Sequence, residues 1–324
     1  MPKQSTRWPS GSSAALREDV LRVLGVLKVA TADQIQELTR PHLTYRHPTS
    51  VAMRTKAHRN AALDLAHHDL THSEGATREG RKLWGLTPAG LQAAAQALGR
   101  PANYMGSTAR GAAAHGAAHA MAVNTTALAL LQPRPTEAQA ATLPAVDQNL
   151  IAHRPHGIGE LDALATEVSL PTAGTDGAPA RGSAQADLVL TAPEHGLPAL
   201  FVEVDRATMT PERVAAKIHR YNAYFNRTDK QLTSTWRQRW NAPTGHPVVA
   251  FVLTGPSQTT VMNRSRDLMK LLRECEAPFP VLGVPLQRLA ERGPWGDTWW
   301  NAARGGAPAP LDVALQPEST NTTP

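Results

Sequence analysis

Cysteine is almost missing from this 324-residue chain, which has a single one, Cys275. One cysteine excludes an internal disulfide framework and a cysteine-based zinc site, and it fits a reducing compartment. The chain also lacks any run near the roughly 18 apolar residues that a membrane span needs. Its first residues, 1–13, are polar and contain no apolar stretch of a secretory signal. We therefore expect a cytoplasmic protein with no membrane partner.

Net positive charge is confined to the first part of the chain. Residues 1–100 contain 14 Lys and Arg against 8 Asp and Glu, whereas residues 101–324 contain 19 of each, so the first hundred carry the whole net charge of +6. A basic module joined to a neutral one predicts that the first part meets a polyanion. Basic residues that only keep a surface soluble are the alternative.

Apolar spacing and capping signals predict four helices and a hairpin in residues 14–100, after a disordered leader at 1–13. Thr31 and Thr87 are of the residue types that cap helix N-termini, and each directly precedes a stretch with helical periodicity. The helices are expected at 14–28, 31–38, 50–68 and 88–98, and the β-hairpin at 70–86.

Three helices, a hairpin and a closing helix in this order resemble a winged helix-turn-helix domain. The Leu-Thr-Pro-Ala-Gly start of the last helix, directly after the hairpin, is common in that class among microbial regulators. In such domains the third helix enters the major groove of double-stranded DNA and the wing contacts the backbone. A winged helix used only for protein contacts is the alternative. The DNA-facing candidates are Arg54, Lys56, Arg59, Asn60, Arg78, Arg81 and Lys82.

Residues 101–140 are expected to form a helical connection that could be the first helix of the next domain. An Ala-rich helix over 108–131 carries His115 and His119 one turn apart. Histidines at this spacing can bind a metal ion, but no third ligand or HExxH glutamate accompanies them. Packed or hydrogen-bonded histidines are therefore the expected role.

Two short apolar runs, 186–190 and 200–205, predict paired strands with buried interiors. Asp187, Glu203 and Asp205 interrupt these runs, and an ionised carboxylate in a buried sheet needs a cation or a hydrogen-bond donor. Glu203 and Asp205 are two apart on one strand, so both face the same side, and the neighbouring strand can place Asp187 beside them. Such hard oxygen ligands suit Mg²⁺ or Mn²⁺.

The remaining pattern predicts one domain over 141–300, followed by a disordered tail at 301–324. Trp236 and Trp240, interleaved with arginines, could stack on a nucleic acid strand, but such tryptophans are more often core anchors. Residues 141–165 have little pattern and are expected to be irregular. The other elements are expected as strands at 163–170, 246–254 and 280–284 and helices at 210–225 and 257–274.

The order helix, strand, strand, strand, helix, strand, with Asp at the second strand and an acidic pair on the third, resembles the PD-(D/E)xK nuclease fold. The chain also contains, after the leading winged helix, His119-Ala-Met-Ala-Val-Asn124, Thr166-Glu167, Ala186-Asp187, Phe201-Val-Glu-Val-Asp-Arg-Ala-Thr208, and Lys217 with Tyr221. Through these features it resembles, within that class, the replication-relaxation family of plasmid and mobile-element proteins, over about residues 16 to 285.

The resemblance implies an α/β protein, with an N-terminal winged helix-turn-helix and a C-terminal nuclease-like mixed sheet flanked by helices. It also implies a role in plasmid replication or DNA relaxation. In the nuclease pattern a lysine stands two residues after the strand glutamate, where this chain has Asp205, so Lys217 is expected to substitute from the adjoining helix. Glu167 is expected to act as an outer ligand or general base. The catalytic candidates are Asp187, Glu203, Asp205, Lys217 and Glu167, and the first three are the metal ligands.

Two functions remain open at this stage. One is metal-dependent nicking of DNA, in which Mg²⁺ or Mn²⁺ polarises the phosphate and activates a water. The other is a non-catalytic DNA-binding accessory factor or repressor, whose carboxylates only pair with Arg206, Arg213 or Arg220. A covalent relaxase is not expected, because no His-hydrophobic-His motif accompanies a dedicated tyrosine. Expected partners are double-stranded DNA and other plasmid replication or transfer proteins, and a palindromic DNA site would indicate a homodimer.

Overall fold

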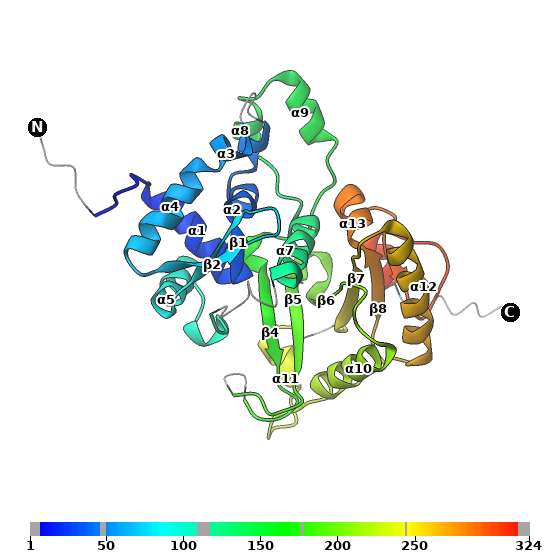
Figure 1. Ribbon diagram of the computed structural model, residues 1–324. Helices are drawn as coiled ribbons and strands as arrows, with labels where there is room; N and C mark the ends of the chain where they lie inside the picture. Colours follow the sequence, from blue (N-terminus) through cyan, green and yellow to red (C-terminus); the bar gives the residue numbers. More distant parts are fainter. Residues whose placement is uncertain (1–6, 46–49, 109–116, 176–177, 244, 317–324) are drawn as a thin grey trace, which may run out of the picture. The chain divides into compact units, whose positions relative to one another are not determined.

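The computed structural model describes residues 7–45, 50–108, 117–175, 178–243 and 245–316 (Figure 1). The protein has a mixed α/β fold in which the chain divides into two compact units. Unit 1 comprises Met1–Asn124, Pro133–Arg154 and Glu160–Asp162, and unit 2 comprises Thr125–Gln132, Pro155–Gly159 and Ala163–Pro324. No helix in the described ranges is both long and apolar enough to cross a membrane.

Unit 1 contains short helices and one small sheet (Figure 1). The sheet has the strand order β1-β3-β2, and both of its strand pairs are antiparallel. The elements are α1 (Ala14–Leu27), β1 (Val29–Thr31), α2 (Ala32–Thr39), η1 (Pro41–Tyr45), α3 (Val51–Arg54), α4 (Lys56–His67), β2 (Thr71–Ala76), β3 (Lys82–Leu86), α5 (Pro88–Ala97), η2 (Ala102–Tyr104), α8 (Glu137–Ala140), α9 (Ala145–Ala152) and η3 (Leu161–Ala163), with the first residues of α7 (Ala117–Leu131).

Side-chain caps begin the helices where the sequence predicts them. The Thr31 hydroxyl accepts from the Gln34 N–H while the Gln34 side chain accepts from the Thr31 N–H, which is a full capping box. Thr87 accepts from the Gly90 N–H at the start of α5. A β-carbon on Gly90 would lie 1.8 Å from the Leu70 carbonyl oxygen, so only glycine lets the α5 start pack against the chain that enters β2.

Two parts of unit 1 differ from the sequence prediction. The helix expected over 50–68 is interrupted at Thr55, whose backbone separates α3 from α4. The leader predicted as disordered includes ordered residues from 7 onward, because Asp64 in α4 accepts hydrogen bonds from the Ser10 and Ser12 N–H groups, at 2.6 Å and 2.9 Å. These bonds anchor the chain just before α1 begins.

Unit 2 contains a six-stranded mixed sheet in the described part of the chain, with the order β4-β5-β6-β7-β8-β9. The pairs β4–β5, β5–β6 and β8–β9 are antiparallel, whereas β6–β7 and β7–β8 are parallel. The elements are β4 (Leu164–Leu170), β5 (Ala184–Ala192), η4 (Pro193–His195), β6 (Leu197–Asp205), α10 (Pro211–Phe225), α11 (Thr235–Arg239), β7 (Val248–Leu253), α12 (Gln258–Glu274), β8 (Val281–Pro285), α13 (Leu286–Arg292), β9 (Trp300–Asn301) and α14 (Leu311–Leu315).

Helices α10 and α12 cover one face of this sheet (Figure 1). Val214, Ile218 and Tyr221 from α10 and Leu268 and Leu272 from α12 share a core with alternate residues of the strands. Strands β7 and β8 are buried along their whole length, as expected for parallel strands covered on both faces. Every second residue of β6 therefore points into the layer that α10 and α12 close, which is where Glu203 and Asp205 lie.

The aromatic-basic segment predicted around α11 belongs mainly to this core. Trp236 is buried in the cluster, and Trp240 packs against it at the edge. Arg237 donates to the carbonyl oxygens of Ala242 and Gly245, so it closes a local turn. The core-anchor interpretation of these tryptophans therefore holds.

The boundary region and the tail also differ from the sequence prediction. Along residues 125–162 the chain passes back and forth between the two units. The end of α7 belongs to unit 2, where the Leu130 carbonyl accepts a hydrogen bond from the Ile158 N–H. The tail expected to be disordered from 301 includes α14, in which Leu311 is fully buried. Residues 317–324 lie outside the described ranges.

Candidate functional site

The candidate carboxylates lie where strands β5 and β6 part. The β5–β6 ladder ends at the pair Leu188–Val202, while β6 stays paired with β7 up to Asp205–Leu253. Beyond the last pair, the Asp187 carboxylate accepts the Val204 N–H at 2.7 Å. The Asp187 side chain thus takes the place of a backbone carbonyl of β5 as the partner of β6. This hydrogen bond places Asp187 beside Glu203 and Val204.

Glu203 has no exposed side-chain surface. The Tyr221 hydroxyl donates to Glu203 Oε1 at 2.8 Å, and Lys217 Nζ donates to Oε2. Both donors come from α10 and are four residues apart, so they lie on the same helix face. The structure therefore brings Lys217 to Glu203 from the neighbouring helix, at the residue where the sequence analysis expected a substitute cation.

Asp205 has its own cation, supplied by the other covering helix. Arg264 in α12 donates from Nε to Asp205 Oδ2 at 2.7 Å and from Nη2 to the Met209 carbonyl at 2.7 Å. The Asp205 side chain is fully buried and that of Arg264 is 15% exposed. Asp205 Oδ1 is buried with no hydrogen-bond partner among the described residues, which leaves one oxygen of this carboxylate unsatisfied.

Glu167 lies at the same level of the sheet, one strand further out. Its neighbours Thr166 and Val168 pair with Leu188 and Ala186, so Glu167 is opposite Asp187. Its side chain is exposed, and its φ of 53° is in the left-handed region, which is unusual for a non-glycine residue in a strand. Backbone strain of this kind is frequent at functional sites.

Burial and crowding of negative charge dominate the electrostatics at Glu203. Loss of solvent and repulsion from Asp187 raise the pKa of Glu203 to about 8, and they outweigh the opposing effects of Lys217 and Tyr221. Burial and the adjacent Glu203 also raise the pKa of Tyr221 well above its ordinary value. The Tyr221 hydroxyl therefore stays protonated and serves as a hydrogen-bond donor to Glu203.

The carboxylates offer hard oxygen donors but do not form a preassembled metal cage. Within the described part of the chain, no group of three or more His, Cys, Asp or Glu side chains is arranged to hold a metal ion. Lys217 and Tyr221 occupy both oxygens of Glu203, whereas Asp205 Oδ1 has no hydrogen-bond partner there. A divalent cation fits the donor chemistry at Asp205 and Asp187, and it would satisfy the buried oxygen.

The salt-bridge alternative expected Arg206, Arg213 or Arg220 as the partners of the carboxylates. The carboxylates do pair with basic side chains, but these are Lys217 and Arg264, whereas Arg213 and Arg220 are exposed on α10. Arg264 was missed because it comes some 60 residues after the acidic pair. Its position four residues before the buried Leu268 was the available signal, since a basic residue next to an apolar stripe can reach a buried carboxylate.

The predicted DNA-facing residues lie on α3, α4 and the β2–β3 hairpin. Lys56, Arg59 and Arg78 are exposed, while Arg54 is half-buried. Arg59 donates to the Ala52 carbonyl at 2.7 Å. The others contact neighbouring groups: Asn60 donates to the Ser10 carbonyl, Arg81 pairs with Asp33 at 2.6 Å, and the Lys82 ammonium lies 4.0 Å from the centre of the Trp84 ring.

The connecting helix supplies structural contacts. Asn124 is fully buried and donates to the Val29 carbonyl at 2.7 Å and to the Gln34 side chain at 3.0 Å, so it supports the capping box of α2. His119 lies in α7, whereas His115 lies outside the described residues. Of the two histidines expected to be packed or hydrogen-bonded, only His119 is therefore described.

Comparison with known proteins gives one match. The family model described as Replication-relaxation matches residues 21–235, about two thirds of the chain. No curated protein and no solved structure matches the chain. The matched stretch contains Asp187, Glu203 and Asp205 with Lys217 and Tyr221, and it ends before Arg264.

Proposed function

Because this chain belongs to the replication-relaxation family, we propose that it acts on DNA in the replication or relaxation of a plasmid or other mobile element, by metal-dependent nicking. The observation that carries the proposal is the position of the three carboxylates where β5 and β6 separate, together with Lys217 of α10, which donates a hydrogen bond to Glu203. A carboxylate pair on one strand, an aspartate on the next and a nearby lysine are the groups of a PD-(D/E)xK nuclease site.

In this proposal Asp187, Glu203 and Asp205 would hold Mg²⁺ or Mn²⁺. When bound, the ion would polarise the scissile phosphate and lower the pKa of the attacking water. The buried side chains of Glu203 and Asp205 would keep bulk water from one side of the site, which strengthens each charge interaction. Lys217, which is 24% exposed, would stabilise negative charge on the phosphate from the α10 side. Glu167 is the exposed carboxylate available to take a proton.

We assign DNA binding to unit 1. The order α1, α2, α4, β2–β3 hairpin and α5 is that of a winged helix-turn-helix, in which α4 would enter the major groove and the hairpin would contact the backbone. Lys56 and Arg59 on α4 and Arg78 on the hairpin are the exposed cations that support this assignment. Arg81 and Lys82 would contribute less, because each already contacts a neighbouring group.

Nicking is tested with supercoiled plasmid in Mg²⁺ or Mn²⁺. We expect Asp187→Asn and Glu203→Gln each to slow the conversion to open circles by at least about 100-fold, because each removes a charge that the phosphodiester step uses. Glu194→Gln, which changes an exposed carboxylate at the opposite end of the β5–β6 hairpin, should leave the rate unchanged. Equal rates in all four proteins would mean that another site or a contaminant cuts the plasmid.

A second function is favoured by one observation. Lys217 and Arg264 already pair with Glu203 and Asp205, as in a nuclease-like domain that has become a scaffold. A DNA-binding accessory factor or repressor would bind the plasmid and would nick it in neither metal ion. The same plasmid assay, combined with a binding measurement, separates this function from the first.

DNA binding by unit 1 has a separate signature. We expect the double variant Lys56→Ala, Arg78→Ala to weaken binding to duplex DNA of any sequence, and to reduce the slope of log K against log salt by about 2, because two phosphate contacts disappear. Fluorescence anisotropy at several salt concentrations measures both. Lys230→Ala, an exposed lysine on the loop after α10, is the matched control. If the double variant has the same slope of log K against log salt as the unchanged chain, the duplex binds to a surface other than that of Lys56 and Arg78.

A further inference from the structure

A groove runs along α12 on the side away from Arg264. It consists of two hollows, of about 360 Å³ and about 430 Å³, that share Met262. The first lies between α12 and β9, and the second lies at the ends of β7 and β8, by the N-terminus of α12. We call this the α12 groove. All of its lining residues lie beyond residue 235, outside the stretch that the family model matches.

The α12 groove is basic. Five of the side chains that line it are Arg or Lys, and the one acidic side chain in the lining is Glu291. The N-terminus of α12, capped by Ser257, adds the positive end of a 17-residue helix to the second hollow. A lining of this composition attracts a polyanion. The basic residues are Arg266, Lys270, Arg273, Arg288 and Arg292.

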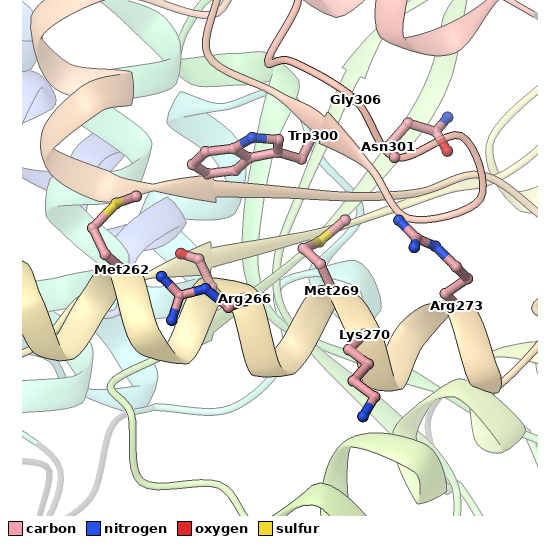
Figure 2. A pocket seen from close by; sticks show the side chains of 10 residues that line it. Met262, Arg266, Met269, Lys270, Arg273, Trp300, Asn301 and Gly306 are labelled. Carbon is pink, nitrogen blue, oxygen red and sulfur yellow. The ribbon is translucent and has the colours of Figure 1, made fainter.

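The groove also offers a flat aromatic surface. Figure 2 shows the Trp300 indole facing α12, with the side chains of Met262 and Met269 rising toward it from the helix. Trp300 is half-buried, and the Arg288 guanidinium lies 5.7 Å from the centre of its ring. In the same view Arg273 extends toward the loop that carries Gly306, while Lys270 points away from the indole. The apolar surface is therefore bordered by cations on several sides.

The groove also contains a buried hydroxyl group. The Ser265 hydroxyl belongs to a residue that is 4% exposed and lines the first hollow, and it has no hydrogen-bond partner among the described residues. A buried hydroxyl of this kind is normally satisfied. A ligand with polar atoms next to a flat ring would satisfy it.

We propose that the α12 groove binds a single strand of DNA, with one base stacked on Trp300 and the sugar-phosphate backbone running past Arg266, Lys270 and Arg288. Aromatic stacking together with a basic track is how proteins hold single strands without reading their sequence. The proposal deepens the proposed function, because a strand freed by nicking is the ligand that this groove fits. A folded duplex cannot present an unstacked base to Trp300, so the groove discriminates against it.

The test measures binding of a fluorescent oligothymidylate of about 15 nucleotides, within the range of site sizes for single-strand binding folds. It uses the full chain carrying Lys56→Ala and Arg78→Ala, so that the unit 1 surface contributes little. Within this background we expect Trp300→Ala to weaken binding about 10-fold and Trp300→Phe to retain most of it, because stacking needs a ring. We expect Arg266→Gln with Lys270→Gln to weaken binding and to lower its salt dependence.

Arg181→Gln, which removes an exposed arginine outside the groove, should bind as the background protein does. The Arg266 and Lys270 variants decide the matter if Trp300→Ala unfolds, because both side chains are exposed. Oligothymidylate binding that neither the tryptophan nor the charge variants change would overturn the proposal, as would the absence of binding. Neither result would affect the test of the proposed function. That function is measured separately, by duplex binding and plasmid nicking of the unchanged chain.

Discussion

Replacing Arg264 with leucine should lower the free energy of unfolding of unit 2 by about 3–5 kcal/mol, because it leaves a fully buried carboxylate without its cation. Asp205 Oδ2 has Arg264 as its partner, and Oδ1 already has no hydrogen bond within the described residues. The loss is measured by hydrogen–deuterium exchange of peptides from β6 and β7 in increasing urea, which reports on unit 2 separately from unit 1.

Two matched variants decide whether the lost charge pair is the cause. Arg266→Leu changes an exposed arginine of the same helix and should alter the free energy by less than about 0.5 kcal/mol. Adding Asp205→Asn to Arg264→Leu should recover a large part of the loss, because the buried charge is then gone. If Arg264→Leu is no more destabilised than Arg266→Leu, the pair does not stabilise the sheet.

The stability of unit 2 should fall as the pH rises from about 5 to 8, and Glu203→Gln should remove most of that fall. Burial raises the pKa of Glu203 from 4.5 to about 8. Between these values the native state keeps a proton that the unfolded chain has lost, so the unfolding free energy decreases with pH. Below 4.5 both states bind the proton, and above 8 neither does, so the slope vanishes there. The full change is on the order of 4 kcal/mol.

The measurement is a series of urea transitions at pH 5, 6, 7 and 8, followed through the same β6 and β7 peptides. Glu194→Gln is the control, because its exposed carboxyl should leave the pH slope of the parent chain intact. Addition of Mg²⁺ should reduce the slope if a divalent cation binds at this site, since a cation favours the ionised carboxylate. A parent chain whose stability is flat or rises over this pH range would show that Lys217 holds Glu203 ionised.

The strands and helices next to the candidate site could be predicted from the sequence because their signals are local. The apolar runs at 186–190 and 200–205 lie within β5 and β6, and the stripe Val214, Ile218, Tyr221 gives α10 its buried face. The two-residue spacing of Glu203 and Asp205 also placed both on one face of β6. Each of these inferences needs only the period of one element.

Contacts between distant elements could not be predicted in the same way. Arg264 and Asp205 are on different elements, and which basic residue reaches the carboxylate depends on how α12 crosses the sheet. No local sequence pattern marks the point beyond Leu188 where β5 separates from β6. There the Val204 N–H is bonded by the Asp187 side chain and not by a backbone carbonyl of β5, which is a contact between two strands. Helix α9 was missed for another reason: Val146 and Leu150 are exposed on it, so it lacks an inward apolar stripe.

Strand β6 joins the two kinds of pairing in the large sheet, antiparallel to β5 and parallel to β7. The family match ends at residue 235, before β7 begins. A fragment trimmed to the matched stretch would therefore leave the β6 backbone open along one side, and open strand edges recruit other chains. In this protein the residues beyond the matched stretch supply both the parallel partner of β6 and the counter-ion of Asp205.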